Sequence, residues 1–492
     1  MRKSGILLPV ASLPSKYGIG TFSKSACKFV ETLRAAGQSY WQILPLGPTG
    51  YGDSPYQSFS TFAGNPYFID LEALVQEGYL TQEDCGAYDF GQDERYIDYE
   101  KIYRSKFKIL RTAFERSNIS ENADFKSFIT ENAYWLEDYA IYMAVKKHFS
   151  GRSWSQWSDG IRKREHSAME RYRNMYSEEI TFYQFQQYIF SKQWAELKSF
   201  ANSNGIRIIG DIPIYVAFDS ADAWAKPELF QFDENMQPKG VAGCPPDGFS
   251  ATGQLWGNPL YDWDYHKDTS YDWWIKRIAY CFKLYDVVRV DHFRGFDEYY
   301  SIPYGDTTAQ NGTWQKGPGY DIFREINMKL GKLDIIAEDL GFLTDTVLEL
   351  VKKTGHKGMK VLEFAFDSRE KSDYLPHNYD KNCVVYTGTH DNETIAGWYE
   401  NLDCTDKQLA MDYLDIDPNK DTDIHWKFIR LALSSVADLA VIPIQDYLGL
   451  GNEARINKPS TVGDNWKWRL LENEITDELV EKIKKVTKTY GR

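Results

Sequence analysis

Short apolar runs rich in β-branched residues recur along the chain, and stretches with the periodicity of a helix lie between most of them. The runs predict strands at residues 5–10, 40–44, 206–212, 287–290, 333–337, 359–364, 383–386 and 440–444. The helical pattern is clearest at 23–36, 319–330, 344–354 and 426–437. Because strands and helices alternate eight times, the pattern predicts an α/β fold, a closed (β/α)8 TIM barrel of parallel strands.

Two gaps in this alternation are too long for a single connecting helix. Roughly 160 residues separate the second and third predicted strands, and roughly 70 separate the third from the fourth, whereas ordinary connections need a few residues and one helix. We therefore predict large, mainly helical insertions at about 47–204 and 217–280. No long linker, low-complexity block or repeat divides the chain, which favours a single catalytic domain over residues 1–492.

Polar side chains follow four of the predicted strands, at the end of the barrel where active sites lie. They are Asp211 at the end of the third strand, Arg289, Asp291 and His292 at the end of the fourth, Glu338 after the fifth, and His390 and Asp391 after the seventh. A polar group at one strand end is common, but carboxylates at four of the eight indicate that they act together. We therefore predict an active site at this end of the barrel.

The two carboxylates after the fourth and fifth strands suit glycosyl transfer, in which one carboxylate attacks the sugar and a protonated one donates to the leaving oxygen. Arg289 and Asp291 lie two residues apart and share one face of their strand. We expect Arg289 to keep Asp291 ionised, and an ionised carboxylate is a nucleophile. Glu338 has apolar neighbours along the chain, which raise the pKa of a carboxyl and suit a general acid. We expect His390 and Asp391 to bind sugar hydroxyls.

Two other interpretations of these residues stay open. Arg289 and Asp291 can form a purely structural ion pair at the end of a strand. A set such as Asp291, His292, Glu338 and Asp391 also suits a Mg²⁺ or Zn²⁺ site, although no metal-ligand spacing is present. We predict that the protein uses neither a metal nor a cofactor.

The overall charge and composition exclude several classes of partner. A net charge of −14, with no basic stripe to offset it, argues against nucleic-acid and anionic-membrane partners. Aromatic residues make up 15% of the chain, and their flat apolar rings suit the faces of sugars. The six cysteines show no Cys/His or CxxC spacing, and no segment is a signal peptide or a membrane span, so we expect a cytoplasmic protein with reduced thiols.

Four segments of the chain resemble the signature segments of α-amylase-type barrels. They are Gly210-Asp211-Ile212-Pro213, Val288-Arg289-Val290-Asp291-His292-Phe293, Ala337-Glu338-Asp339-Leu340-Gly341 and Thr389-His390-Asp391-Asn392. In detail the chain resembles the 4-α-glucanotransferases, also called amylomaltases or disproportionating enzymes, because residues 47–60 and 245–259 match further segments of that family. The likeness extends from residue 12 to residue 469, nearly the whole chain, and nothing like the C-terminal β-sandwich of typical amylases follows the barrel.

The resemblance implies a retaining double displacement on α-1,4-glucan, with Asp291 as nucleophile, Glu338 as acid/base and Asp391 as transition-state stabiliser. It implies further substrate-binding residues. Around the donor sugar these are Arg289, His292, His390 and Asp211, with Tyr56 and Ser54 beside it. Trp256 and the 245–251 loop, which contains Asp247, lie toward the acceptor, and Tyr51 is a further substrate-binding residue. The implied partners are maltooligosaccharides, starch or glycogen-derived glucans, and glucose.

Three functions are compatible with these features of the sequence. The first is a 4-α-glucanotransferase, the second an α-1,4-glucan hydrolase of the same barrel class, and the third a glucan-binding protein without activity. The intact set of Asp291, Glu338 and Asp391 argues against the third. Transferase and hydrolase share the chemistry up to the glycosyl-enzyme and differ only in whether a sugar hydroxyl or water ends the reaction.

Overall fold

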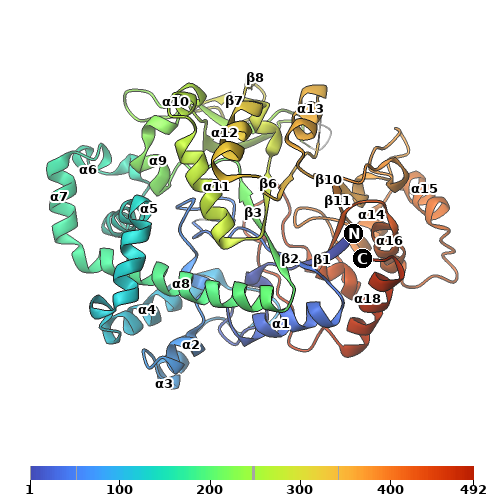
Figure 1. Cartoon of the computed structure of the whole chain (residues 1–492), viewed down its shortest axis with the longest axis horizontal. Coiled ribbons are helices and arrows are strands. Elements are labelled where there is room, and N and C mark those ends of the chain that lie inside the picture. The colour runs from blue at the N-terminus through green and yellow to red at the C-terminus, as the bar shows by residue number, and fades with distance from the viewer. Residues whose placement is uncertain (1, 51, 247–249, 342) are drawn as a thin grey trace.

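Eight parallel strands form the central sheet of the protein. The computed structural model describes residues 2–50, 52–246, 250–341 and 343–492 (Figure 1). Across the sheet the order is β10 (Gly358–Val361), β11 (Cys383–Tyr386), β12 (Leu439–Pro443), β1 (Lys3–Leu7), β2 (Tyr40–Gln42), β3 (Arg207–Pro213), β6 (Val287–Asp291) and β9 (Ile335–Ala337). Each of these strands overlaps one of the eight that the sequence predicts, so the predicted strand set is confirmed.

The two outer strands of this sheet, β9 and β10, meet and close it into a barrel. The N–H of Ala337 donates to the carbonyl oxygen of Lys357 at 2.8 Å, beside the parallel bridge between Ile336 and Lys357. Because β9 is only three residues long, a side chain extends the joint: the Asp339 carboxylate accepts the N–H of Met359 at 2.6 Å. A Cβ on Gly358 would lie 2.4 Å from Asp339 Oδ2, so this joint requires glycine there. The predicted (β/α)8 barrel is confirmed.

Alternation along β6 explains how a buried strand presents charge to the site. Val288 and Val290 belong to the large outer core between the strands and the surrounding helices, whereas Val287 belongs to the cluster inside the barrel. With a period of two residues, Arg289 and Asp291 share the inner face with Val287. The predicted separation of the two faces of this strand is therefore confirmed.

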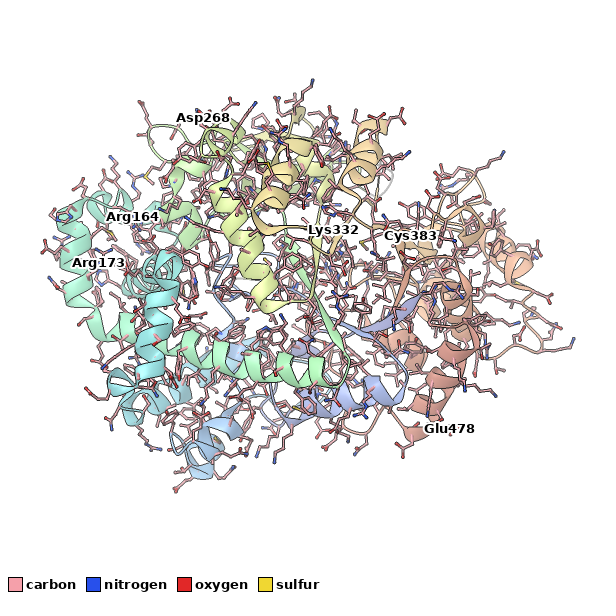
Figure 2. The ribbon with its side chains drawn as sticks, viewed as in Figure 1. Arg164, Arg173, Asp268, Lys332, Cys383 and Glu478 are labelled. Atoms are coloured by element: carbon pink, nitrogen blue, oxygen red, sulfur yellow. The ribbon has the colours of Figure 1, made fainter. Side chains whose placement is uncertain are left out.

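Helices surround the barrel in chain order. They are α1 (Lys24–Ala35), α12 (Tyr320–Leu330), α13 (Asp345–Thr354), α14 (Ile395–Asn401), α15 (Cys404–Leu414), α16 (Ile424–Ser434), α17 (Ile444–Leu448) and α18 (Asp477–Thr489). Helix α1 shows why such segments fold: Ser23 caps its first turn, and Ala26, Phe29, Val30 and Leu33 recur on one face and are buried. Charged side chains such as Arg173, Asp268 and Glu478 project at the outer surface (Figure 2).

The chain between β2 and β3 is helical, as predicted for an insertion at this point. It contains α2 (Leu71–Gln76), α3 (Gln82–Gly86), α4 (Tyr99–Arg116), α5 (Ala123–His148), α6 (Asp159–Arg162), α7 (His166–Met175) and α8 (Ser177–Ser203). Helices α4 to α7 lie to one side of the barrel, and α8 returns the chain toward β3 (Figure 1). Within the described ranges, none of the helices has the length and apolar character needed to cross a membrane.

The chain between β3 and β6 is mainly helical, as expected, but it also contains strands that the sequence did not predict. Besides α9 (Ala221–Ala225), α10 (Trp263–Asp268) and α11 (Asp272–Leu284), it holds the strands β4 (Gly240–Cys244) and β5 (Gln254–Pro259). These pair with β7 (Glu298–Pro303) and β8 (Thr313–Lys316) in an antiparallel sheet of order β5-β4-β7-β8. Sequence reasoning missed this sheet because β4 has two glycines in five residues and β5 ends in Gly257-Asn258-Pro259, a pattern typical of turns. In addition, β7, the second partner of β4, follows β6 in the chain.

Candidate active site

Arg289 links two carboxylates, Asp211 and Asp291, near the carboxyl ends of β3 and β6. Its Nη1 donates to both oxygens of Asp211, at 2.8 and 2.7 Å, and to Asp291 Oδ1 at 2.9 Å. The contact to Asp211 follows from strand register, because Asp211 on β3 pairs directly with Arg289 on β6. The side chains of Arg289 and Asp211 are 3% and 0% exposed, whereas that of Asp291 is 29% exposed. Asp291 is therefore the member of this group that solvent or substrate reaches.

The ionisation of Asp291 differs from the expectation that the Arg289 charge outweighs burial. Burial raises the pKa of Asp291, Arg289 lowers it, and the neighbouring carboxylates Asp211 and Asp391 raise it again, with a net rise to about 6. Arg289 is shared with Asp211, so Asp291 gains only part of its charge. The carboxyl is still mostly ionised at pH 7, which is what a nucleophile requires.

Glu338 directly follows β9, which lies beside β6 in the barrel. Because Val290 on β6 pairs with Ala337 on β9, Glu338 lies level with Asp291. Backbone N–H groups fix its carboxylate: that of His292 donates to Oε2 at 2.7 Å and that of Leu340 to Oε1 at 2.9 Å. Burial and the charge of Asp291 nevertheless raise the pKa of Glu338 to about 7, against the opposing effects of Arg289 and these hydrogen bonds. Glu338 therefore keeps a proton at higher pH than Asp291, as the predicted general acid requires.

His292 reaches this position through an unusual backbone conformation. Its φ is +56°, in the left-handed region that residues other than glycine adopt rarely. This conformation turns the chain sharply after β6 and lets the His292 N–H donate to Glu338. Burial and nearby Arg294 lower the pKa of His292 to about 3, so its ring is neutral. Within the described part of the chain, its Nε2 is buried and has no hydrogen-bond partner.

Asp391 is held from two directions beyond the end of β11. His390 Nε2 lies 3.3 Å from Asp391 Oδ2, and the Asn457 amide donates to Asp391 Oδ1 at 2.6 Å. Burial opposes ionisation of Asp391, but His390 and Asn457 outweigh it and hold its pKa below the ordinary value. Asp391 also raises the pKa of His390 against the effect of burial. Asp391 is therefore ionised at neutral pH, and its charge favours the protonated form of His390.

Tyr56 packs flat against His390 and joins it to Asp211. The two rings are 5.2 Å apart at 13°, and the Tyr56 hydroxyl donates to Asp211 Oδ2 at 3.0 Å. Trp466 adjoins both rings, at 5.9 Å from Tyr56 and 6.0 Å from His390. Tyr56 thus bridges the ends of β3 and β11 and forms part of an aromatic wall.

Trp256 lies on the opposite, antiparallel-sheet side of this site. Its ring meets that of His292 edge to face, with 4.7 Å between the centroids and 86° between the planes. Trp256 belongs to β5, so the antiparallel sheet places an aromatic side chain next to His292, which directly follows Asp291. The sheet that sequence reasoning missed therefore contributes to the site.

Three of the predicted substrate-binding residues are not brought to the site by described contacts. The Ser54 hydroxyl accepts the N–H of Tyr56 at 3.3 Å, a contact that shapes the turn before Tyr56. Tyr51 and Asp247 lie outside the described residues. Conversely, Asn457 and Trp466 are at the site and had not been singled out from the sequence, although Trp466 belongs to a segment that carried the family resemblance.

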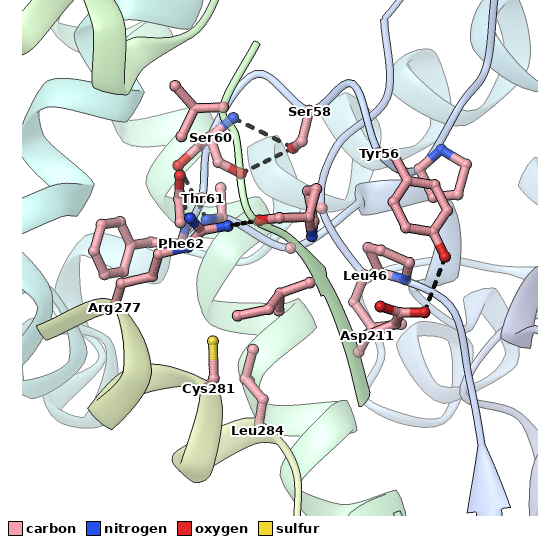
Figure 3. Close-up of a pocket in the computed structure, with 18 of the residues that line it drawn as sticks. Leu46, Tyr56, Ser58, Ser60, Thr61, Phe62, Asp211, Arg277, Cys281 and Leu284 are labelled. Atoms are coloured by element: carbon pink, nitrogen blue, oxygen red, sulfur yellow. Dashed lines mark hydrogen bonds between the residues drawn. The ribbon is translucent and has the colours of Figure 1, made fainter. Parts of the chain in front are cut away.

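A small cavity lies behind Tyr56 and Asp211, apart from Asp291, Glu338 and Asp391. Its volume is about 50 Å³, room for a few water molecules. Figure 3 shows Arg277 and Cys281 at the end of the cavity away from Asp211. Arg277 donates to the carbonyl oxygen of Ile214 at 2.7 Å and thereby fixes the chain just after β3.

The metal-site interpretation finds no support in the positions of these side chains. Over the residues that the structure describes, no group of three or more His, Cys, Asp and Glu side chains is placed to hold a metal ion. Asp291, His292, Glu338 and Asp391 are all among those residues. Two carboxyls of differing pKa, Asp291 and Glu338, together with the ionised Asp391, instead suit glycosyl transfer.

Comparison with known proteins identifies the chain. The model of the 4-alpha-glucanotransferase family, glycoside hydrolase family 77, matches residues 8–474. The chain belongs to this family. It is 50% identical to the 4-alpha-glucanotransferase of Clostridium butyricum over 485 residues, 98% of this chain and 99% of that one. It is 46% identical to the 4-alpha-glucanotransferase of Thermus thermophilus, over 97% of this chain and 96% of that one.

Solved structures agree with this family assignment. The amylomaltase from Streptococcus agalactiae in complex with acarbose is 43% identical and superimposes with a TM-score of 0.97, over 100% of both chains. The amylomaltase from Corynebacterium glutamicum, only 19% identical, shares the fold with a TM-score of 0.80 over 99% of this chain and 75% of that one. The family is one of retaining transferases, so the 4-alpha-glucanotransferase prediction is confirmed and the hydrolase alternative is not favoured.

Proposed function

We propose that the site transfers α-1,4-glucan segments by a double displacement in which Asp291 is the nucleophile and Glu338 the acid/base. Asp291 attacks the anomeric carbon of the donor while Glu338 gives its proton to the departing glycosidic oxygen. The 4-hydroxyl of an acceptor then attacks the glycosyl-enzyme, loses its proton to Glu338 and releases Asp291. Two inversions at one carbon retain the α configuration.

The observation that carries this assignment is the difference between the two carboxyls. Asp291 is partly exposed beside Arg289, whereas two backbone N–H groups fix Glu338 and its pKa is raised further, to about 7. A partly exposed, ionised carboxylate suits attack on carbon, and a protonated one suits donation to the leaving oxygen. Both arise from neighbouring strands, so the roles follow from barrel geometry rather than from loop conformation.

We assign the charged pair His390 and Asp391 to the transition state, in which the anomeric carbon becomes positive. The ionised Asp391 stabilises that charge, and Asn457 holds the carboxylate in place. Tyr56 supplies a flat face for the donor ring, and the unpartnered Nε2 of His292 is available to a sugar hydroxyl. These assignments keep the donor sugar between β3, β6 and β11.

In this proposal, aromatic side chains on the side of the site opposite Tyr56, which we call the acceptor wall, favour attack by an acceptor sugar over attack by water. A glycosyl-enzyme survives only if water is kept from the anomeric carbon while an acceptor is held in position to attack. Trp256, which contacts His292, is the residue that we assign to this wall. Maltooligosaccharides, starch or glycogen-derived glucans are the proposed donors, and glucose or another glucan the acceptor.

Two broader expectations accompany this proposal. We propose that residues 1–492 act as one catalytic domain, since helices before and after the insertions pack on the same core. A cytoplasmic location stays a prediction from the sequence.

Incubation with pure maltotriose tests the function. Transfer produces a ladder of longer glucans together with glucose, and the number of reducing ends stays constant because each bond broken is replaced by one formed. Hydrolysis produces only shorter sugars and a rising number of reducing ends. A product mixture without any glucan longer than maltotriose would contradict the proposal.

A further inference from the structure

Asp446 connects the two ends of the loop that carries His390 and Asp391. This β11–α14 loop comprises residues 387–394. The Thr387 hydroxyl, at its start, donates to Asp446 Oδ2 at 2.5 Å. The N–H of Ile395, directly after its end, donates to Asp446 Oδ1 at 2.8 Å. Asp446 is 1% exposed and belongs to α17, just after β12.

Because each oxygen of the Asp446 carboxylate accepts one of these hydrogen bonds, the connection constrains the distance between the two loop ends. The two oxygens of a carboxylate are a fixed distance apart, so Thr387 and Ile395 are held at one separation. Between them the loop has no helix or strand, and its internal contacts are short-range, such as the Thr389 hydroxyl donating to Asn392 Oδ1 at 2.8 Å. The spacing of the loop ends, and with it the height of Asp391 above the barrel, therefore depends on Asp446.

The start of the loop has little freedom to adjust if this connection is lost. Gly388 lies against the buried side chain of Glu363, and a Cβ at 388 would be 2.4 Å from Glu363 Oε1. Movement in that direction is blocked by packing. Release from Asp446 would instead displace the loop, and with it His390 and Asp391, away from Glu363.

The middle of the loop rests on the same downstream part of the chain. Arg455 donates to the carbonyl oxygen of Asp391 at 2.6 Å, and the N–H of Asn457 donates to that of His390 at 3.0 Å. This support is joined to α17 where the Gln445 amide donates to the Ala454 carbonyl at 3.2 Å. One segment after β12 thus holds the loop at its ends and its centre, and the Asp446 side chain accepts a hydrogen bond at each end.

We propose that Asp446 is a positioning residue for glycosyl transfer, which fixes His390 and Asp391 over the nucleophile by holding both ends of the β11–α14 loop. Asp446 is buried behind the loop and acts through it. The inference rests on the proposed role of Asp391, and the experiment separates the two.

The test compares kcat and KM on maltotriose for Asp446→Ala, Asp446→Asn and Thr387→Val. We expect Asp446→Ala to lower kcat by roughly 10- to 100-fold, because small misplacements of catalytic groups have effects of that size, with KM changed about threefold or less. Asp446→Asn keeps an acceptor for Ile395 and should recover much of the loss. Thr387→Val removes only one contact and remains informative if the alanine variant does not fold.

A double-mutant cycle distinguishes positioning from general destabilisation. If Asp446 acts through Asp391, Asp446→Ala should lower the first-turnover rate on α-glucosyl fluoride much less in an Asp391→Asn background than in wild type. Asp70→Ala is the matched control: Asp70 is 7% exposed and caps α2, away from the loop. That control should lower the melting temperature without changing kcat.

The possible outcomes separate the two ideas. An Asp446→Ala or Thr387→Val enzyme that is folded and retains wild-type kcat would overturn the positioning role, as would an equal loss of rate in both backgrounds. Wild-type activity of Asp391→Asn alone would instead overturn the proposed function of Asp391.

Discussion

Arg289 contacts both carboxylate oxygens of the fully buried Asp211 from the same nitrogen that reaches Asp291. Burial raises the pKa of Asp291, and Arg289, which also pairs with Asp211, only partly opposes this rise, so the carboxyl is still mostly ionised at pH 7. The pairing with Asp211 also means that Arg289 keeps a charged partner when Asp291 is neutralised. A buried guanidinium without any partner would strongly destabilise the protein.

Asp291→Asn should abolish transfer and leave the fold intact. The amide cannot attack carbon, so we expect kcat on maltotriose to fall by about a thousandfold or more. The melting temperature should change little because Asp211 still pairs with Arg289. A sugar trapped covalently on another residue, with Asp291 unmodified in a peptide map, would overturn the assignment.

Glu338→Gln should slow donors in proportion to their need for a proton. On maltotriose we expect a loss of about 10²- to 10⁴-fold, the usual contribution of a general acid. Fluoride leaves with little protonation, so the first-turnover release of fluoride from α-glucosyl fluoride should be far less affected. Equal losses on the two donors would show that Glu338 is not the acid.

The pH dependence of kcat/KM should be bell-shaped, with its maximum between about 6 and 7. Asp291 must be ionised, so activity falls as pH decreases through about 6; Glu338 must be protonated, so activity falls as pH increases through about 7. Because the two carboxyls interact, the charge of each affects the pH at which the other titrates. The alkaline limb should disappear for α-glucosyl fluoride, and its persistence there would contradict the assignment of that limb to Glu338.

Trp256→Ala should lower transfer more than hydrolysis, because an acceptor ring loses its stacking partner and water needs none. The measurement is the ratio of free glucose to total bonds cleaved on maltotetraose. Trp314→Ala is the matched control: strand register aligns Trp314 with Tyr300, Gly243 and Leu255, so it lies on the face of the same sheet opposite to Trp256. An unchanged hydrolysis fraction in Trp256→Ala, with a lower overall rate, would remove Trp256 from the acceptor wall.

Dialysis against EDTA should leave turnover unchanged, since the chemistry assigned to Asp291 and Glu338 needs no Lewis acid. The assay is maltotriose disproportionation before and after chelation, with magnesium, calcium and zinc added back separately. Loss of activity that one of these ions restores would revive the metal-site interpretation.

The sequence predicted those parts of the site that belong to the strands. Asp291 is the last residue of β6, Glu338 directly follows β9, and Asp391 lies in the polar segment that follows β11, so the local pattern alone marks them. Asn457 contacts Asp391 across 66 positions in the chain and carries no local signal of its own. The same is true of β4, whose pairing with β7 requires the whole of α10, α11 and β6 to be in place. Contacts made between distant segments were the ones that sequence reasoning missed.

The pKa of Asp291 is also higher than the Arg289–Asp291 pair alone would suggest, for a related reason. From the sequence, Arg289 and Asp291 form an isolated pair two residues apart. The third member, Asp211, joins them only when β3 and β6 align, and it divides the charge of Arg289 between two carboxylates. Burial is the largest cause of the raised pKa, and the repulsion between Asp211 and Asp291 adds to it; the second of these causes is visible only once the two strands are aligned.

The side-chain joint between β9 and β10 has a mechanical consequence. Asp339, which completes that joint through the Met359 N–H, directly follows Glu338 in the chain. A ring closed in part by a side chain opens there more readily than where full ladders of backbone hydrogen bonds run. Because Asp339 is bonded to Glu338 along the chain, we expect each opening of this joint to displace the Glu338 carboxyl. The hydrogen-exchange rate of the Met359 amide would then measure how often Glu338 leaves its catalytic position.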